Sequence, residues 1–236
     1  MGVKEKKVGA LKKIYILHGW AYSTEKWAEF NNLLKKAQYE PIMLKIPGLT
    51  EKISKVWSLD DYAEWLKKSI NNKKSTVLGH SNGGRIALAF AAKYPDIVEQ
   101  IILIDSAGIY HNELSMRIKR VLFKGVARLG KRVTSSEKLR GVLYRATRES
   151  DYKEAPIEVR ETMSNLIRSD LRAQLPNITT PTLLIWGKDD KVTPLEDGQL
   201  MHKLLKNSQL EIVSGARHSP QFTHPEEVVK KITQKL

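Results

Sequence analysis

A complete G-x-S-x-G motif spans residues 79–83 and is followed directly by Gly84. The apolar run before it predicts a strand, and the run RIALAFAAKY after it predicts a helix. A serine lifted clear of a sheet needs a sharp, strained turn, and glycines let the neighbouring backbone pass close to it. The helix that begins there also points backbone N–H groups toward a developing negative charge. The sequence therefore predicts Ser81 as a nucleophile, the alternative being a tight turn with an inert serine.

A serine hydroxyl attacks effectively only when a base takes its proton, and histidine is the usual base. The chain has six histidines: His18, His80, His111, His202, His218 and His224. His218 lies in GARHSP, between the last predicted strand and the last predicted helix, so a loop presents it at the carboxyl edge of the sheet. His224 more simply opens the last helix. We therefore predict His218 as the base.

The base needs a carboxylate that holds its tautomer and stabilises the imidazolium. The segment WGKDDKVTP offers Asp189 and Asp190 after the fifth predicted strand, and Asp105 ends the strand IILID. The chain order serine, aspartate, histidine is the order expected when a G-x-S-x-G nucleophile tops a sheet of this type. These residues alone leave the three carboxylates open as alternatives.

His18-Gly19-Trp20 ends the first predicted strand, and its glycine lets backbone amides turn toward the nucleophile. We predict an oxyanion hole formed by the backbone N–H groups of Trp20 and Asn82. His18 itself is expected to order this loop.

Short apolar runs alternate with helical patterns along the whole chain. Six runs predict strands: Lys13–Leu17, Ile42–Ile46, Thr76–Leu78, Ile101–Ile104, Thr182–Trp186 and Leu210–Val213. Helical patterns lie at about 24–37, 59–71, 82–93, 195–206 and 225–235, with Thr24, Asp60 and Pro225 as helix-entry signals. This alternation predicts an α/β fold with a doubly wound, mostly parallel sheet of about six strands.

Residues 110–175 interrupt the alternation, because they carry helical patterns and no convincing strand. We interpret them as a helical cap inserted between sheet strands of one domain that spans residues 1–236.

Composition narrows the class of protein. The 236 residues contain no cysteine, which excludes disulfides, thiolate metal sites and a cysteine nucleophile. The histidines and carboxylates lack metal-ligand spacing such as H-E-x-x-H, and no phosphate or dinucleotide loop occurs, so we expect neither a metal nor a cofactor. No apolar run approaches the length of a membrane span, and the lysine-rich start lacks an apolar signal core. These features favour a cytoplasmic protein that acts on a small molecule, as a monomer or homodimer.

The net charge of +14 is large for this length. Residues 111–148 contain eleven Lys and Arg against two acids, so most of the excess lies in the cap. Such a segment predicts weak contact with an anionic membrane surface or, as the blander alternative, a solvated helical face. Aromatic residues do not alternate with the basic ones, which argues against nucleic-acid binding.

The stretches HGW, SLDDYA, GHSNGGR, WGKDDKVTP and GARHSPQFTHPEEV together resemble the α/β-hydrolase superfamily over nearly the whole chain. In that family's W-G-x-x-D-x-x-x-P pattern the catalytic acid takes the fifth place, so the resemblance implies Asp190. The first predicted strand here resembles the family's third. The SNGGR element and a small cap are similar to those of compact bacterial members.

The resemblance implies a hydrolase of carboxylic esters or thioesters with small to medium acyl groups, acting through an acyl-enzyme. The alternative is a carbon–carbon hydrolase or lyase with the same triad on a carboxylate-bearing substrate. Arg85 is similar to an arginine with which the menaquinone-pathway lyase of this fold holds carboxylates, so Arg85 is a candidate substrate-binding residue. His18 is a second candidate for substrate binding. However, His80 stands where that lyase usually has tyrosine and where carbon–carbon hydrolases often have asparagine. A binding protein on a hydrolase scaffold is a third hypothesis.

Overall fold

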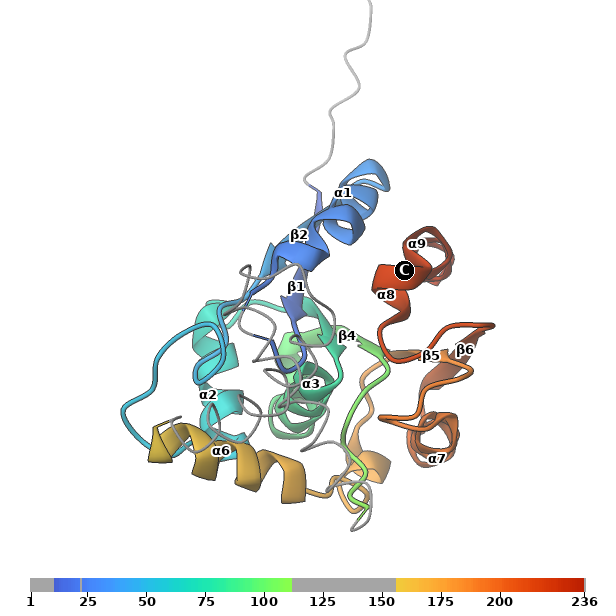
Figure 1. The fold of residues 1–236 in the computed structure, drawn as a ribbon. Coiled ribbons are helices and arrows are strands. Elements are labelled where there is room, and N and C mark those ends of the chain that lie inside the picture. The colour runs from blue at the N-terminus through green and yellow to red at the C-terminus, as the bar shows by residue number, and fades with distance from the viewer. Residues whose placement is uncertain (1–10, 22, 112–155, 236) are drawn as a thin grey trace, which may run out of the picture.

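The computed structural model describes residues 11–21, 23–111 and 156–235. Its centre is a six-stranded sheet in the order β2-β1-β3-β4-β5-β6, in which every neighbouring pair is parallel (Figure 1). The strands are β1 (Lys12–Leu17), β2 (Tyr39–Met43), β3 (Ser75–His80), β4 (Val98–Ile104), β5 (Thr182–Gly187) and β6 (Ser208–Val213). Strands β3 and β5 are buried at every residue, which explains why their sequences are apolar on successive positions.

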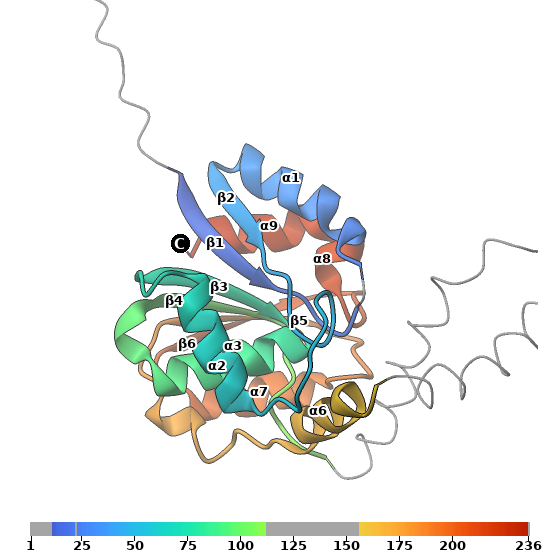
Figure 2. The same ribbon diagram turned by 90° about the vertical axis from the view of Figure 1, so that its left-hand side faces the viewer.

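Helices cover both faces of this sheet (Figure 2). One face carries α1 (Ala28–Lys36), the short α8 (Pro220–Thr223) and α9 (Pro225–Thr233). The other carries α2 (Leu59–Ser69), α3 (Asn82–Lys93), α6 (Ile157–Arg168) and α7 (Leu195–Leu204). Three short 3₁₀ turns complete the described elements: η1 (Glu25–Trp27), η2 (Pro95–Ile97) and η3 (Leu175–Asn177). The prediction of a doubly wound α/β fold is confirmed, with all six strands parallel.

The strand order reverses between β1 and β3. The connection through α1 runs from β1 outward to β2, whereas the connection through α3 runs from β3 in the other direction to β4. The loops leaving β1 and β3 therefore diverge to opposite faces, and open α/β sheets bind ligands in the crevice at such a switch point. The HGW segment and the G-x-S-x-G motif are the two loops that meet there.

Two local predictions were wrong. The second strand is Tyr39–Met43 rather than Ile42–Ile46, and the chain has already entered a turn at Ile46, whose carbonyl accepts from the Leu49 and Thr50 amides. Ile46 is apolar because it is fully buried in the core, not because it belongs to the ladder. Pro41 is accepted within the strand because β2 is an edge strand with one neighbour.

The second error concerns the residue that caps α2: the helix begins at Leu59, as predicted, but its N-cap is Ser58 and Asp60 lies within the first turn. Ser58 Oγ accepts from the Asp61 amide while the Asp61 carboxylate accepts from the Ser58 amide, which is a reciprocal capping box.

The proposed cap is described only in part. Helix α6 lies within the region predicted to be helical, whereas residues 112–155, with nearly all of the basic segment, lie outside the described residues. Within the described ranges, no helix is both long enough and apolar enough to cross a bilayer.

Candidate active site

Ser81 occupies a strained turn between β3 and α3. Its backbone has φ 53° and ψ −119°, a conformation that a residue with a side chain rarely adopts. Four backbone hydrogen bonds hold it there: the Ser81 amide donates to Ile104 O over 3.1 Å, and Ser81 O accepts from the amides of Gly84 (3.0 Å), Arg85 (3.4 Å) and Ala107 (2.9 Å). The turn is therefore fixed by β4 and by its own helix, as a nucleophile elbow requires.

Two glycines allow β1 and its loop to lie against this turn. A Cβ added to Gly83 would lie 2.1 Å from Leu17 O, so no side chain fits there. A Cβ on Gly19 would lie 3.0 Å from Ser81 Cβ and 2.9 Å from His80 Nδ1. The loop after β1 consequently approaches the predicted nucleophile at van der Waals distance.

Trp20 follows Gly19 in the loop after β1, and Asn82 follows Ser81 as the first residue of α3. Neither amide donates a hydrogen bond to any residue of the described part of the chain. The first amides of a helix have no intrahelical partner and favour a negative charge. A pair of available amides beside a strained serine is what an oxyanion hole requires.

His18 is fully buried beneath that loop. Its Nδ1 lies 2.7 Å from Gly19 O and its Nε2 lies 3.2 Å from Thr50 Oγ1. Burial lowers the pKa of His18, which keeps the ring neutral near pH 7. With both ring nitrogens bonded within the protein, the side chain fixes the loop rather than facing a substrate.

His218 pairs with Asp190 across the loops that follow β6 and β5. His218 Nδ1 lies 2.8 Å from Asp190 Oδ2, while Asp190 Oδ1 accepts from the amides of Val192 and Thr193. The Thr193 hydroxyl also donates to Asp190 Oδ2 over 2.7 Å. Asp189, the neighbouring candidate, is exposed to solvent. Of the three carboxylates, Asp190 is thus the one bonded to the imidazole.

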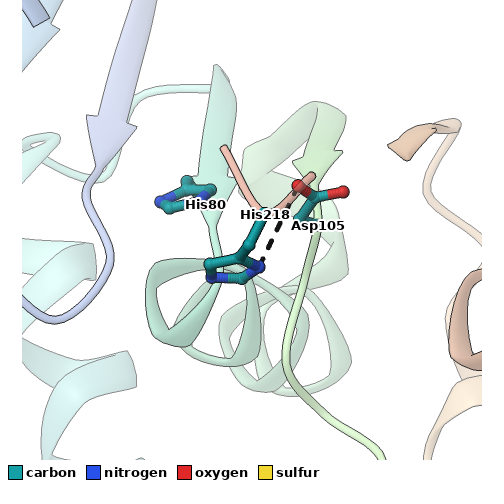
Figure 3. A group of neighbouring side chains, drawn as sticks. All are labelled: His80, Asp105 and His218. Carbon is teal, nitrogen blue, oxygen red and sulfur yellow. Dashed lines mark ion pairs between the residues drawn. The ribbon is translucent and has the colours of Figure 1, made fainter. Parts of the chain in front are cut away.

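Asp105 has a different set of contacts. Its side chain is fully buried, with Oδ1 accepting from the Gly187 amide (2.8 Å) and Oδ2 from the Ser219 amide (2.7 Å). Asp105 Oδ2 is 3.9 Å from His218 Nδ1, too far for a hydrogen bond (Figure 3). Burial, and then the charge of Asp190, raises the pKa of Asp105 to about 7.

His80, Asp105 and His218 each offer one ligand atom, and these atoms lie within 4.8 Å of one another (Figure 3). The atoms are engaged already: His80 Nε2 with Ser219 Oγ at 3.1 Å, His218 with Asp190, and Asp105 with two amides. Each of the three side chains is thus hydrogen-bonded to another group of the protein.

The structure brings Ser81, His218 and Asp190 to the same edge of the sheet. The His80 ring, adjacent in sequence to Ser81, lies 5.0 Å from the His218 ring between centroids. No hydrogen bond joins Ser81 Oγ to His218 within the described residues; such bonds are often long without substrate. The remaining histidines lie elsewhere: His111 bonds Asp197, His202 bonds Ser208 and His224 bonds Thr223.

Arg85 lies on the first turn of α3 and is only 4% exposed. Its Nη1 donates to Asn82 Oδ1 over 3.0 Å, whereas its Nε and the Asn82 Nδ2 are buried without a partner among the described residues. Burial lowers the pKa of Arg85 to about 10, so it is still protonated at neutral pH. The charge of Asp170 opposes this shift, so the buried guanidinium has one direct hydrogen bond among the described residues and one nearby carboxylate.

Two residues with evident roles were missed by the sequence reasoning. Thr193 bridges Asp190, His218 and the Asp105 carbonyl, and Ser219 bonds Asp105 and His80. Only their proximity in sequence to Asp190 and His218 could have indicated them, since serine and threonine are common in loops.

Curated relatives match nearly the whole chain. A pimeloyl-[acyl-carrier protein] methyl ester esterase of Neisseria meningitidis is 24% identical over 92% of this chain and 90% of its own length. The monoacylglycerol lipase ABHD6 of Rattus norvegicus is 24% identical over 97% of this chain and 76% of its own.

Solved structures show the same fold. A putative lipase from Acinetobacter baumannii superposes with a TM-score of 0.74 at 23% identity, covering 96% of this chain and 83% of its own. The esterase EaEST from Exiguobacterium antarcticum has a TM-score of 0.73 at 22% identity, covering 96% and 92%. The family model described as serine aminopeptidase, S33, matches residues 10–223. The chain therefore belongs to the S33 family of the α/β-hydrolase superfamily.

Proposed function

We propose that this protein is a serine carboxylic ester hydrolase in which Ser81 is the nucleophile, His218 the general base and Asp190 the acid that orients His218. The observation that carries the proposal is the strained backbone of Ser81 at the top of the β3–α3 turn. Strain of this kind persists only where the surroundings hold it, and it clusters at active sites. The relatives named as an esterase and a lipase support the same reaction class.

In the first half-reaction, Ser81 Oγ attacks the ester carbonyl while His218 Nε2 takes its proton. The backbone N–H groups of Trp20 and Asn82 bind the oxyanion that forms. Asp190, bonded to His218 Nδ1, stabilises the resulting imidazolium. The intermediate collapses when the carbon–oxygen bond to the leaving group breaks and His218 returns the proton to the departing alcohol. Ser81 is left acylated.

In the second half-reaction, His218 takes a proton from a water molecule, which attacks the acyl carbon. The same amides bind the second oxyanion. Collapse expels Ser81 Oγ, which regains its proton from His218, and a carboxylic acid is released. Residues and backbone groups of this chain supply every proton transfer and charge contact in the cycle.

The substrate is an ester with a small to medium acyl group. One curated relative is named as a methyl ester esterase and the other as a monoacylglycerol lipase, which favours an oxygen ester over a thioester as the substrate here. Those names do not favour the carbon–carbon hydrolase or lyase alternative.

The test is hydrolysis of nitrophenyl esters from short to long acyl chains by wild type and Ser81→Ala. We expect the variant to lose about 10⁴-fold or more in kcat, because removal of the nucleophile leaves only the oxyanion hole and binding. The acyl length that gives the highest kcat/KM indicates the length of the acyl-binding pocket. Turnover that survives in Ser81→Ala would contradict the mechanism.

We also propose that Arg85 binds an anionic group of the substrate. Support comes from its burial, from the Nε that has no partner among the described residues, and from its position one helical turn beyond Ser81. A substrate carboxylate would supply the missing partner, and such charge-assisted bonds are about twice as strong as neutral ones.

Arg85→Met tests this subsite, because methionine keeps the apolar volume and removes the charge. The substrates are the methyl half-ester of a dicarboxylic acid and the methyl ester of a monocarboxylic acid of equal length. We expect kcat/KM for the half-ester to fall at least about tenfold more than for the neutral ester. Equal losses on both substrates would reject the anionic subsite.

Three further predictions stay proposals: cytoplasmic location, a monomeric or homodimeric state, and weak contact of the basic segment with an anionic membrane surface. The basic residues concerned lie in 111–148, of which only His111 is described. The charge of that segment supports the last proposal.

A further inference from the structure

Ser219, the residue after the proposed base, has an unfavourable backbone conformation. Its φ of 93° and ψ of 55° place it in the left-handed region, although it is not glycine. It also precedes Pro220, and a residue before proline is normally driven to extended conformations. Such a conformation is strained and persists only when surrounding contacts determine it.

Two side chains from neighbouring strands make those contacts. The Ser219 amide donates to Asp105 Oδ2 over 2.7 Å, and the Ser219 hydroxyl lies 3.1 Å from His80 Nε2. Figure 3 shows His80 at the end of β3 and Asp105 at the end of β4, on either side of His218. The backbone that carries His218 is thus anchored to both strands.

Asp105 is one of the two residues that hold the loop at Ser219. It is fully buried, and its other carboxylate oxygen accepts from Gly187 at the end of β5, so the group links three segments. Its oxygen is 3.9 Å from His218 Nδ1, compared with 2.8 Å for Asp190. Asp105 therefore hydrogen-bonds the residue next to the imidazole, whereas the imidazole itself hydrogen-bonds Asp190.

His80 is equally constrained as the other anchor. It is 6% exposed and packs edge-on against Trp27 and Phe222, with centroid separations of 6.0 and 6.2 Å. Burial, and then the nearby His218, lowers the pKa of His80 well below its ordinary value, so the ring is neutral. Because His80 precedes Ser81, its bond to Ser219 links the neighbour of the nucleophile to the neighbour of the base.

We propose that Ser219 is a positioning residue: its amide and hydroxyl anchor the loop to Asp105 and His80 and so hold His218 in place for proton transfer from Ser81. This inference rests on the base role proposed above for His218. A base displaced by even about 1 Å loses much of its rate, while ground-state binding of the ester depends on other residues.

The first test is Ser219→Ala, which removes the hydroxyl contact and keeps the amide contact to Asp105. With the best nitrophenyl ester, we expect kcat to fall about tenfold, the size of one hydrogen bond, while KM stays within about twofold. Ser214→Ala is the matched control, because Ser214 lies exposed in the same loop and makes no side-chain hydrogen bond within the described residues. It should retain the wild-type kcat.

The second test is a double-mutant cycle with Asp105→Asn. If both residues act through one loop, the double variant loses less in kcat than the product of the two single losses. Wild-type kcat in Ser219→Ala, or losses that multiply, would overturn the inference, as would equal changes in kcat and KM. These outcomes differ from failure of the hydrolase mechanism itself, in which Ser81→Ala would keep its activity.

Discussion

Ser81 and the glycines around it come from the six residues 79–84, whereas the acid–base side of the site is assembled from loops far apart in the chain. His218 bonds Asp190 across 28 positions, and Ser219 bonds Asp105 across 114. The elbow is held by backbone contacts that leave no room for a side chain at Gly83. The acid–base loops are held by side-chain hydrogen bonds. Changes to the elbow glycines should therefore damage folding, and changes to Asp190 in the acid–base loops should damage chemistry while leaving the fold intact.

Among these variants, the largest loss of activity without loss of the fold is expected at Asp190. Asp190→Asn should lower kcat about 10⁴-fold with a near-native circular dichroism spectrum, because an amide cannot hold the required histidine tautomer. Asp189→Asn is the matched control, since Asp189 is exposed and should leave kcat within about twofold of wild type. Equal losses of kcat in the two variants would show that His218 does not depend on Asp190 more than on Asp189.

Gly83→Ala should show the opposite behaviour. Its Cβ would meet Leu17 O at 2.1 Å, and backbone in the sheet cannot move aside, so we expect the free energy of unfolding to fall by about 3 kcal/mol or more. Gly215, in the loop before His218, has φ +72° and no atom within 4 Å of a built Cβ. Gly215→Ala should cost only about 1–2 kcal/mol from backbone strain. Urea denaturation of the two variants measures both values, and similar losses would remove the distinction between the regions.

The smallest effect is the pH dependence that Asp105 gives to stability. Burial and Asp190 raise the pKa of Asp105 to about 7, whereas His218 and the amides of Gly187 and Ser219 oppose that shift. The folded protein therefore binds a proton more tightly than the unfolded chain. The stabilising contribution of protonated Asp105 is fully present below the ordinary carboxyl pKa and is lost as pH rises through about 7.

Thermal denaturation of wild type and Asp105→Asn between pH 5 and pH 8 tests this sign. Asparagine has no proton to lose, so the melting temperature of wild type should fall relative to that of the variant as pH rises. A difference that is constant with pH, or that changes in the other direction, would show that Asp105 is ionised throughout the range.

The elements predicted correctly from the sequence are those whose bounds are set by residues close to them in the chain. The helix 82–93 was predicted with its observed bounds, because glycines and an apolar face mark it. The second strand was misplaced by three residues because Ile46 is apolar for a tertiary reason, its burial in the core. The start of α2 was predicted correctly, but its entry signal was not, because Ser58, Asp60 and Asp61 all suit a helix entry and only the hydrogen bonds between Ser58 and Asp61 distinguish them.

The sequence by itself determined the strand-turn-helix around Ser81, the class of fold and the order of the candidate groups, because backbone sterics and hydrophobic periodicity act over a few residues. The family resemblance implied Asp190, but the residue types and their chain positions left three carboxylates open, and the tertiary structure shows the physical reason that Asp190 meets His218. Asp105, Asp189 and Asp190 all follow strands, and the choice depends on loop geometry: Asp190 lies at hydrogen-bond distance, Asp105 turns to the Ser219 amide, and Asp189 faces solvent. Hydrogen bonds between loops form only after the parallel sheet has brought the carboxyl ends of its strands together, and no local pattern encodes that distance.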